Sequence, residues 1–225
     1  MSETNQELKK EFELERMILF SDAVFAIGIT LLVIEIKFPE IPAEATKDAI
    51  IEAFKPVYIR FFAFMLSFFF IGMMWSRHLK MFKYLRTYDD GLIMRNLIFI
   101  FFVVCFPFTV SGFSENVKDG HIFPIFFYLV NIWLVNVAHF CLCYYLFKQK
   151  KQLCIPGFEK EKKYMLITGG ATSLILTITL SIMIIVSFVY PGELIPVISS
   201  IYLMPILLII SKRKLKKYKP LKPKD

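Results

Sequence analysis

Two polar side chains interrupt the first long apolar stretch of this sequence, and they are the groups within it that could do chemistry. Ser21 and Asp22 lie in a run that is otherwise mostly apolar from Met17 to Ile34. A carboxylate inside a membrane helix is costly unless partners compensate it, so such a residue marks either a functional site or a structural hydrogen-bond acceptor. For Asp22 both interpretations remain open.

Hydrogen-bond donors for these two residues come from the next two apolar stretches. The second stretch ends with Trp75 and His78, and the third begins close to Asn96. If consecutive helices run in opposite directions, all five residues fall at similar depth near the same face of a membrane. Indole, imidazole and amide groups can donate to a hydroxyl and a carboxylate. A polar network that joins three helices is therefore expected.

The elements that would position these residues are transmembrane helices. The chain has 225 residues, of which 56% are hydrophobic and 20% are charged, and its mean hydropathy is +0.58. Soluble domains have about 45–50% apolar and about 25% charged residues. Apolar stretches of about 20 residues predict an all-α integral membrane protein, with six helices over residues 17–36, 57–79, 92–112, 122–147, 165–190 and 193–211. A soluble enzyme, a disordered chain and a nucleic-acid module are excluded as first interpretations.

The loops between these helices predict the orientation of the chain. Of the 27 Lys and Arg residues, 22 lie on the side that carries both termini, and the other side holds Lys37, Lys47, Lys55, Arg60 and Lys118. Because cytoplasmic loops are enriched in Lys and Arg, both termini are expected in the cytoplasm and the protein in the plasma (inner) membrane. We divide the chain into a cytoplasmic segment (1–16), a six-span domain (17–211) and a basic tail (212–225). The tail is expected at the anionic lipid surface and not on nucleic acid.

One face of the first helix forms a narrow apolar stripe. At 100° per residue, with Ile27 placed at 0°, Leu31 falls at about 40°, Ile34 at about −20° and Thr30 at about −60°. Ser21 and Asp22 fall at about 120° and −140° and point elsewhere. By periodicity alone, such a stripe faces lipid, packs against another helix or lines a pore.

Motifs for enzyme chemistry are absent from the sequence. The chain has no phosphate-binding glycine loop, no Cys-x-x-Cys pair, no His-Glu-x-x-His helix and no nucleophile elbow. His139 and Cys143 are one helical turn apart, but no third metal ligand accompanies them. No enzymatic activity and no cofactor are therefore expected.

Two patterns resemble the lysosomal potassium channel family, which comprises transmembrane protein 175 and its bacterial relatives. The first helix carries the specific part of the resemblance, in Arg16-x-x-x-Phe20-Ser21-Asp22 and the following Ile27-x-Ile29-Thr30-Leu31-Leu32 run. Trp75-x-x-His78 and Asn96 also resemble family positions. Gly28 stands where another small residue such as Ala is expected.

The resemblance implies that the first helices of several chains line a central pore in a symmetric oligomer. One chain supplies one such helix, so closed symmetry is required, and the bacterial relatives imply a homotetramer. In the family's arrangement Ile27 would form the narrowest ring, with Leu31 and Ile34 beside it and Thr30 as the selectivity layer. Potassium ions would pass near Ile27 and Thr30. A structural hydrogen-bond network would hold the helix, formed by Arg16, Ser21, Asp22, Trp75, His78 and Asn96.

Three functions remain after the sequence has been considered. The first is a passive, potassium-preferring cation channel with a hydrophobic constriction. The second is an ion- or proton-coupled transporter that uses Asp22 and His78, although the sequence predicts no inverted repeat and no interrupted helix. The third is a membrane scaffold that transports nothing.

Overall fold

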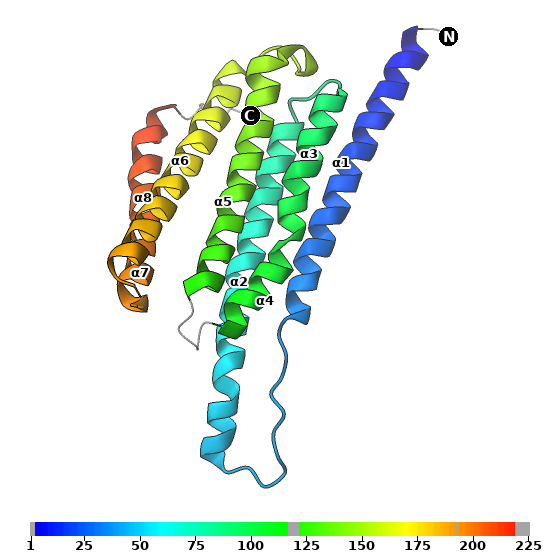
Figure 1. Ribbon diagram of the computed structural model, residues 1–225. Helices are drawn as coiled ribbons and strands as arrows, with labels where there is room; N and C mark the ends of the chain where they lie inside the picture. The colour runs from blue at the N-terminus through cyan, green and yellow to red at the C-terminus, as the bar shows by residue number, and fades with distance from the viewer. Residues whose placement is uncertain (1–2, 117–121, 192, 219–225) are drawn as a thin grey trace.

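The computed structural model describes residues 3–116, 122–191 and 193–218, and the regular elements within them are helices (Figure 1). They form six stretches that are long and apolar enough to cross a membrane, so the predicted all-α, six-span fold is confirmed. Lys118 and residues 219–225 of the predicted tail lie outside the described residues. The α-helices are α1 (Glu3–Ile34), α2 (Lys47–Phe82), α3 (Asp90–Val104), α4 (Phe106–Asn116), α5 (Ile122–Tyr144), α6 (Glu159–Val189), α7 (Leu194–Ile201) and α8 (Leu203–Leu215).

The helices form a bundle with α1 at one edge and α8 at the other (Figure 1). Helix α1 contacts α2, α3 and α4, whereas α6 contacts α5, α7 and α8. The start of α1 and the end of α8 lie toward the same end of the bundle (Figure 1). At that end a π-helix (Tyr145–Gln149) and a 3-10 turn (Lys151–Leu153) follow α5.

Two helices begin earlier than their apolar residues predict. Helix α1 begins at Glu3 and not at residue 17, because the Glu, Gln, Leu and Lys residues before the apolar run are good helix formers. Helix α2 begins at Lys47 and not at residue 57, because the Thr46 side chain accepts a hydrogen bond from the Ala49 N–H (3.3 Å) and caps the helix. Hydropathy therefore located the membrane part of each helix and missed its extension into water.

The third and sixth spans are each broken into two helices. Helix α3 ends at Val104, Cys105 follows in a helical conformation, and α4 begins at Phe106. Pro107 has no N–H to donate to the carbonyl four residues earlier, and it is tolerated in the first turn of a new helix. Pro205 likewise lies in the first turn of α8, which begins at Leu203 after α7 ends at Ile201. Each pair still forms one membrane-crossing stretch, Asp90–Glu115 and Ile195–Tyr218, because Cys105 and Tyr202 at the junctions keep helical backbone angles.

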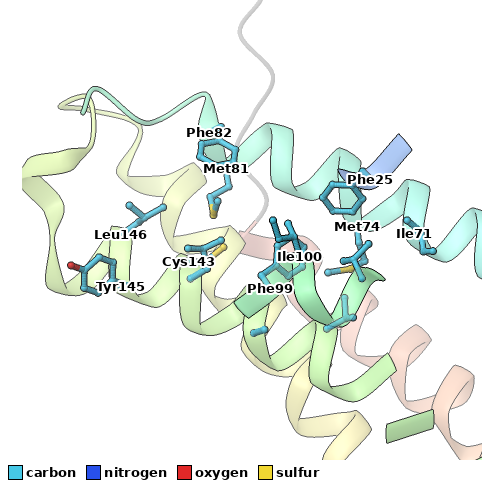
Figure 2. Close-up of a cluster of buried hydrophobic side chains, with 14 of the residues drawn as sticks. Phe25, Ile71, Met74, Met81, Phe82, Phe99, Ile100, Cys143, Tyr145 and Leu146 are labelled. Atoms are coloured by element: carbon cyan, nitrogen blue, oxygen red, sulfur yellow. The ribbon is translucent and has the colours of Figure 1, made fainter. Parts of the chain in front are cut away.

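The bundle interior is built from α1, α2, α3 and α5. Figure 2 shows Phe25, Met74, Phe99 and Cys143 among the buried side chains of these helices. The rings of Phe25 and Phe99 have their centroids 5.8 Å apart. Packing of this kind stabilises helix association in a membrane, where lipid is as apolar as the side chains. The core thus fixes one side of α1 against α2 and α3.

Candidate functional site

A chain of buried hydrogen bonds joins α1, α2 and α3. The His78 Nε2 lies 2.8 Å from the Asn96 Oδ1, and the Asn96 Nδ2 donates to the Ser21 Oγ over 2.8 Å. The Ser21 hydroxyl then donates to the Met17 carbonyl (3.0 Å). Because an amide oxygen can only accept, His78 carries its ring proton on Nε2. We call Ser21, Asn96 and His78 the buried polar chain; all three are at most 1% exposed.

Aromatic rings enclose the imidazole of His78. Its ring centroid lies 4.3 Å from that of Phe82, 5.2 Å from that of Phe99 and 5.6 Å from that of Phe25. The other ring nitrogen, Nδ1, has no hydrogen-bond partner among the described residues. The single bond to Asn96 is therefore the polar contact that compensates the burial of this ring.

Asp22 belongs to a second, separate contact. The Trp75 indole N–H donates to the Asp22 Oδ1 over 2.8 Å, and this pair is partly exposed. Ser21 and Asp22 are neighbours in sequence but point about 100° apart on the helix. Five of the six predicted network residues thus lie in two hydrogen-bonded sets. The buried polar chain joins α1, α3 and α2, and the pair of Asp22 and Trp75 joins α1 to α2.

Arg16 belongs to neither set. It is exposed, and its charge acts on Tyr88, whose hydroxyl donates to the Glu13 carboxylate. The hydrogen bond to Glu13 raises the pKa of Tyr88, and the Arg16 charge partly opposes this effect. No hydrogen bond among the described residues links Arg16 to Ser21 or Asp22, so its place in the network stays a prediction.

The face of α1 opposite the buried polar chain is open. Ile27 is 57% exposed, Leu31 39% and Ile34 65%, whereas Phe25 and Leu32 are at most 1% exposed. Thr30 is also exposed, and its hydroxyl donates to the Ile27 carbonyl (3.0 Å). The three residues of the predicted stripe and Thr30 at its edge therefore share a face that the described part of the chain leaves largely exposed.

Gly28 lies on the buried side of α1, against α3. A Cβ built at Gly28 would lie 3.8 Å from the Val103 Cγ1, which is an ordinary van der Waals distance. The departure from the expected Ala at this position is therefore sterically neutral.

Polar residues of α5 also form interhelical hydrogen bonds. The Asn131 Nδ2 donates to the Thr109 Oγ1 of α4 (3.3 Å), and the Arg77 Nη1 of α2 donates to the Asn136 Oδ1 (3.4 Å). The His139 Nδ1 lies 3.8 Å from the Cys143 Sγ. Among the described residues, no group of three His, Cys, Asp or Glu side chains is placed to hold a metal ion.

A cluster at the end of the bundle where α1 begins and α8 ends was missed in the sequence. Asp89 caps α3 by accepting from the Leu92 N–H (2.8 Å), and it also accepts from the Tyr145 hydroxyl (2.7 Å). The guanidinium of Arg95 lies 3.9 Å from the Tyr145 ring centroid, and the Lys150 Nζ lies 3.7 Å from the Asp89 Oδ2. Burial would raise the pKa of Asp89, but these hydrogen bonds and charges together hold it below its usual value. The sequence signal that could have drawn attention to this cluster is Asp89 itself, since Asp is a preferred N-cap residue before a helix.

Comparison with known proteins matches the first half of this chain to a channel family. Residues 16–107 match the model of the family described as endosomal/lysosomal potassium channel TMEM175. A potassium channel of Streptomyces collinus is 34% identical over 104 residues, which are 46% of this chain and 49% of that protein. The endosomal/lysosomal proton channel TMEM175 of Rattus norvegicus is 28% identical over 96 residues, which are 43% of this chain and 19% of that protein.

The similarity to solved structures extends over nearly the whole chain. The crystal structure of a lysosomal potassium-selective channel TMEM175 homolog from Chamaesiphon minutus superposes with a TM-score of 0.69 at 20% identity, covering 90% of this chain and 98% of that one. The chain spans about half the length of the curated bacterial relatives it matches in sequence. These relatives are ion channels by name, a class without an enzymatic reaction. The resemblance seen in the sequence is confirmed: residues 16–107 match the endosomal/lysosomal potassium channel TMEM175 family, and the fold of the chain is that of the Chamaesiphon minutus homologue.

Proposed function

We propose that this protein is a subunit of a passive, potassium-preferring cation channel whose pore is lined by α1. One observation carries the proposal. Hydrogen bonds hold α1 against α2 and α3 on two sides, and on its third side Ile27, Leu31 and Ile34 are exposed. The names of the relatives, which are potassium and proton channels, support the same class of function.

The side chains on the open face would form a hydrophobic constriction. Ile27 would be the narrowest ring, with Leu31 and Ile34 beyond it. The Thr30 hydroxyl donates its proton to the Ile27 carbonyl, so its oxygen lone pairs remain free to accept from the water around a passing ion. Potassium ions would therefore pass near Ile27 and Thr30. Selectivity should be modest, because backbone carbonyls in a helix cannot replace the hydration shell of the ion as a carbonyl filter does.

A single α1 cannot enclose a pore, so the channel needs several copies of this chain. We propose a homotetramer with closed symmetry. The basic loops support a plasma (inner) membrane location with both termini in the cytoplasm. The buried polar chain and the Asp22–Trp75 pair would then hold each α1 near the inner face without touching the ion.

The experiment is a reversal-potential measurement on the purified full chain in a planar bilayer, with potassium on one side and sodium on the other. The potential should shift toward the potassium equilibrium value, and Thr30→Ala should reduce that shift. Ile27→Asn should raise the leak current, because it wets the narrowest ring. Ile185→Asn is the matched control, since Ile185 is 60% exposed in the membrane part of α6.

Two outcomes would contradict the pore assignment. Unchanged currents in both α1 variants would remove α1 from the pore, and an equal effect of Ile185→Asn would point to general membrane damage. Silent bilayers that contain intact oligomers would favour the non-transporting scaffold.

A coupled transporter built on Asp22 and His78 is less well supported. Its two titratable groups lie in separate hydrogen-bonded sets, and three aromatic rings close off the imidazole. The breaks at Cys105 and between α7 and α8 lie on other helices than these two residues. Saturable flux that is coupled to a proton gradient would favour the transporter over the channel.

A further inference from the structure

A basic cavity lies between α2, α5, α6 and α8, on the opposite side of the bundle from the open face of α1. Its volume is about 540 Å³, within the range of sites for small ligands. Among the described residues, five cationic side chains and no Asp or Glu line it; the five are Arg77, Lys80, Lys212, Arg213 and Lys216. Two of them come from α2 and three from the end of α8 and the turn after it, so the fold assembles this charge from distant parts of the chain.

Arg77 is a cation of this cavity that has no counter-ion among the described residues. Its guanidinium is half-buried and donates to the Asn136 Oδ1 (3.4 Å) and toward the Met74 Sδ (3.8 Å). Within the described residues no carboxylate lies at salt-bridge distance from it. A partly buried cation without a counter-ion is unfavourable, and an anionic ligand would compensate its charge.

Apolar residues also line the cavity. Leu208 lies one helical turn before Lys212, and Met165 and Gly169 face it from α6. The hydroxyls of Thr168 and Thr172 also line the cavity, but they donate to carbonyls of their own helix (2.8 Å each). The cavity thus combines cations with apolar residues, and His139 of α5 also lines it, with an Nε2 that has no hydrogen-bond partner among the described residues.

We propose that this cavity binds the phosphate headgroup of an anionic phospholipid, with the glycerol and acyl part against Leu208 and Met165. Basic pockets between transmembrane helices on the cytoplasmic side are suited to such headgroups. The apolar lining residues favour a lipid over free phosphate. Helix α8 contributes no buried residue and lies at the edge of the bundle (Figure 1), so a lipid can reach the cavity from the bilayer.

The test measures lipid binding to the purified full chain in detergent by native mass spectrometry. Palmitoyl-oleoyl phosphatidylglycerol should bind, and phosphatidylcholine with the same acyl chains should bind at least about tenfold more weakly. In separate arms, inorganic phosphate replaces the lipid as the probe. The readout is independent of conduction, so its result does not depend on the proposed channel function.

Two pairs of substitutions in the tail separate a site from general attraction. Lys212→Gln with Lys216→Gln removes two lining charges, and the affinity for phosphatidylglycerol should fall about 25-fold, at about fivefold per charge. Lys214→Gln with Lys217→Gln removes the same charge from positions that do not line the cavity, and the affinity should change less than about threefold. Lys80→Gln, on α2, should lower the affinity about fivefold without altering the tail. Each variant is first checked for an unchanged Tm in lipid-free detergent.

Equal weakening by the two tail pairs would overturn the proposal, because diffuse attraction to the tail would then explain binding. Equal affinity for phosphatidylglycerol and phosphatidylcholine would overturn it as well. Inorganic phosphate that binds as tightly as phosphatidylglycerol would identify a free-phosphate site and would refute the lipid as the occupant.

Discussion

Asn96→Leu should destabilise the protein by about 2–4 kcal/mol, because it breaks the buried polar chain at its middle. The substitution removes the acceptor of the His78 Nε2–H, and the Nδ1 of the same ring already has no partner. An unsatisfied buried donor costs about 1–3 kcal/mol, and the lost bond to Ser21 about 1 kcal/mol more. The phenylalanine rings around His78 offer no replacement acceptor.

The double variant His78→Phe with Asn96→Leu should be more stable than Asn96→Leu alone, by about 1–3 kcal/mol. Replacing both partners of a buried hydrogen bond by apolar groups of similar shape is nearly neutral, whereas removing one partner leaves the other unpaired. Equilibrium unfolding in mixed dodecylmaltoside–SDS micelles, followed by tryptophan fluorescence, gives the free energies of unfolding.

Asn131→Leu is the matched control for this experiment. Asn131 is also buried, at 4% exposed, but its partner Thr109 keeps a second hydrogen bond to the Phe106 carbonyl (3.0 Å). Its loss should therefore cost about 1 kcal/mol. A double variant that is no more stable than Asn96→Leu would refute the reasoning, since the cost would then not arise from an unpaired imidazole.

Two further stability predictions follow from the packing of α1 and from the cluster around Asp89. Gly28→Ala should raise the free energy of unfolding by about 0.5–1 kcal/mol, because a helix-interior Gly loses more entropy on folding than Ala and Val103 leaves room for the methyl group; a lower Tm would show that this space is not available. The pKa of Asp89 is lower in the folded protein than in the unfolded chain. The charged carboxylate therefore stabilises the folded protein fully above the unfolded pKa, and this stabilisation is lost as the pH falls through the folded pKa. Measured between pH 6 and pH 3, the Tm of the wild type should therefore fall more than that of Asp89→Asn, and parallel curves would contradict the role of Tyr145 and Lys150 in holding the carboxylate charged.

The sequence located the buried polar chain because depth in a membrane can be counted along helices. Ser21, His78 and Asn96 lie at matching distances from the same helix ends, and hydropathy places those ends within a few residues. The Asp89 cluster was not predictable in this way. Asp89 and Tyr145 are 56 residues apart, and their contact depends on a π-helix after α5 that no apolar pattern indicates. The antiparallel backbone contact between Leu85 and Cys154, which closes the same end of the bundle, also has no signal in composition.

Adjacent residues with different partners explain how α1 keeps a defined open face. With Ile27 at 0°, Ser21 lies at about 120° and Asp22 at about −140°, so the three residues divide the helix surface into thirds. Ser21 is bound to α3 through Asn96, and Asp22 is bound to α2 through Trp75. One contact alone would leave α1 free to rotate about it, whereas two contacts on different sides fix its rotation. The remaining third, with Ile27, Thr30 and Ile34, is then the face that α1 must present to whatever lies outside this chain. By fixing the rotation of α1, these hydrogen bonds determine which side chains would line a pore, although none of the hydrogen-bonded residues would contact the ion.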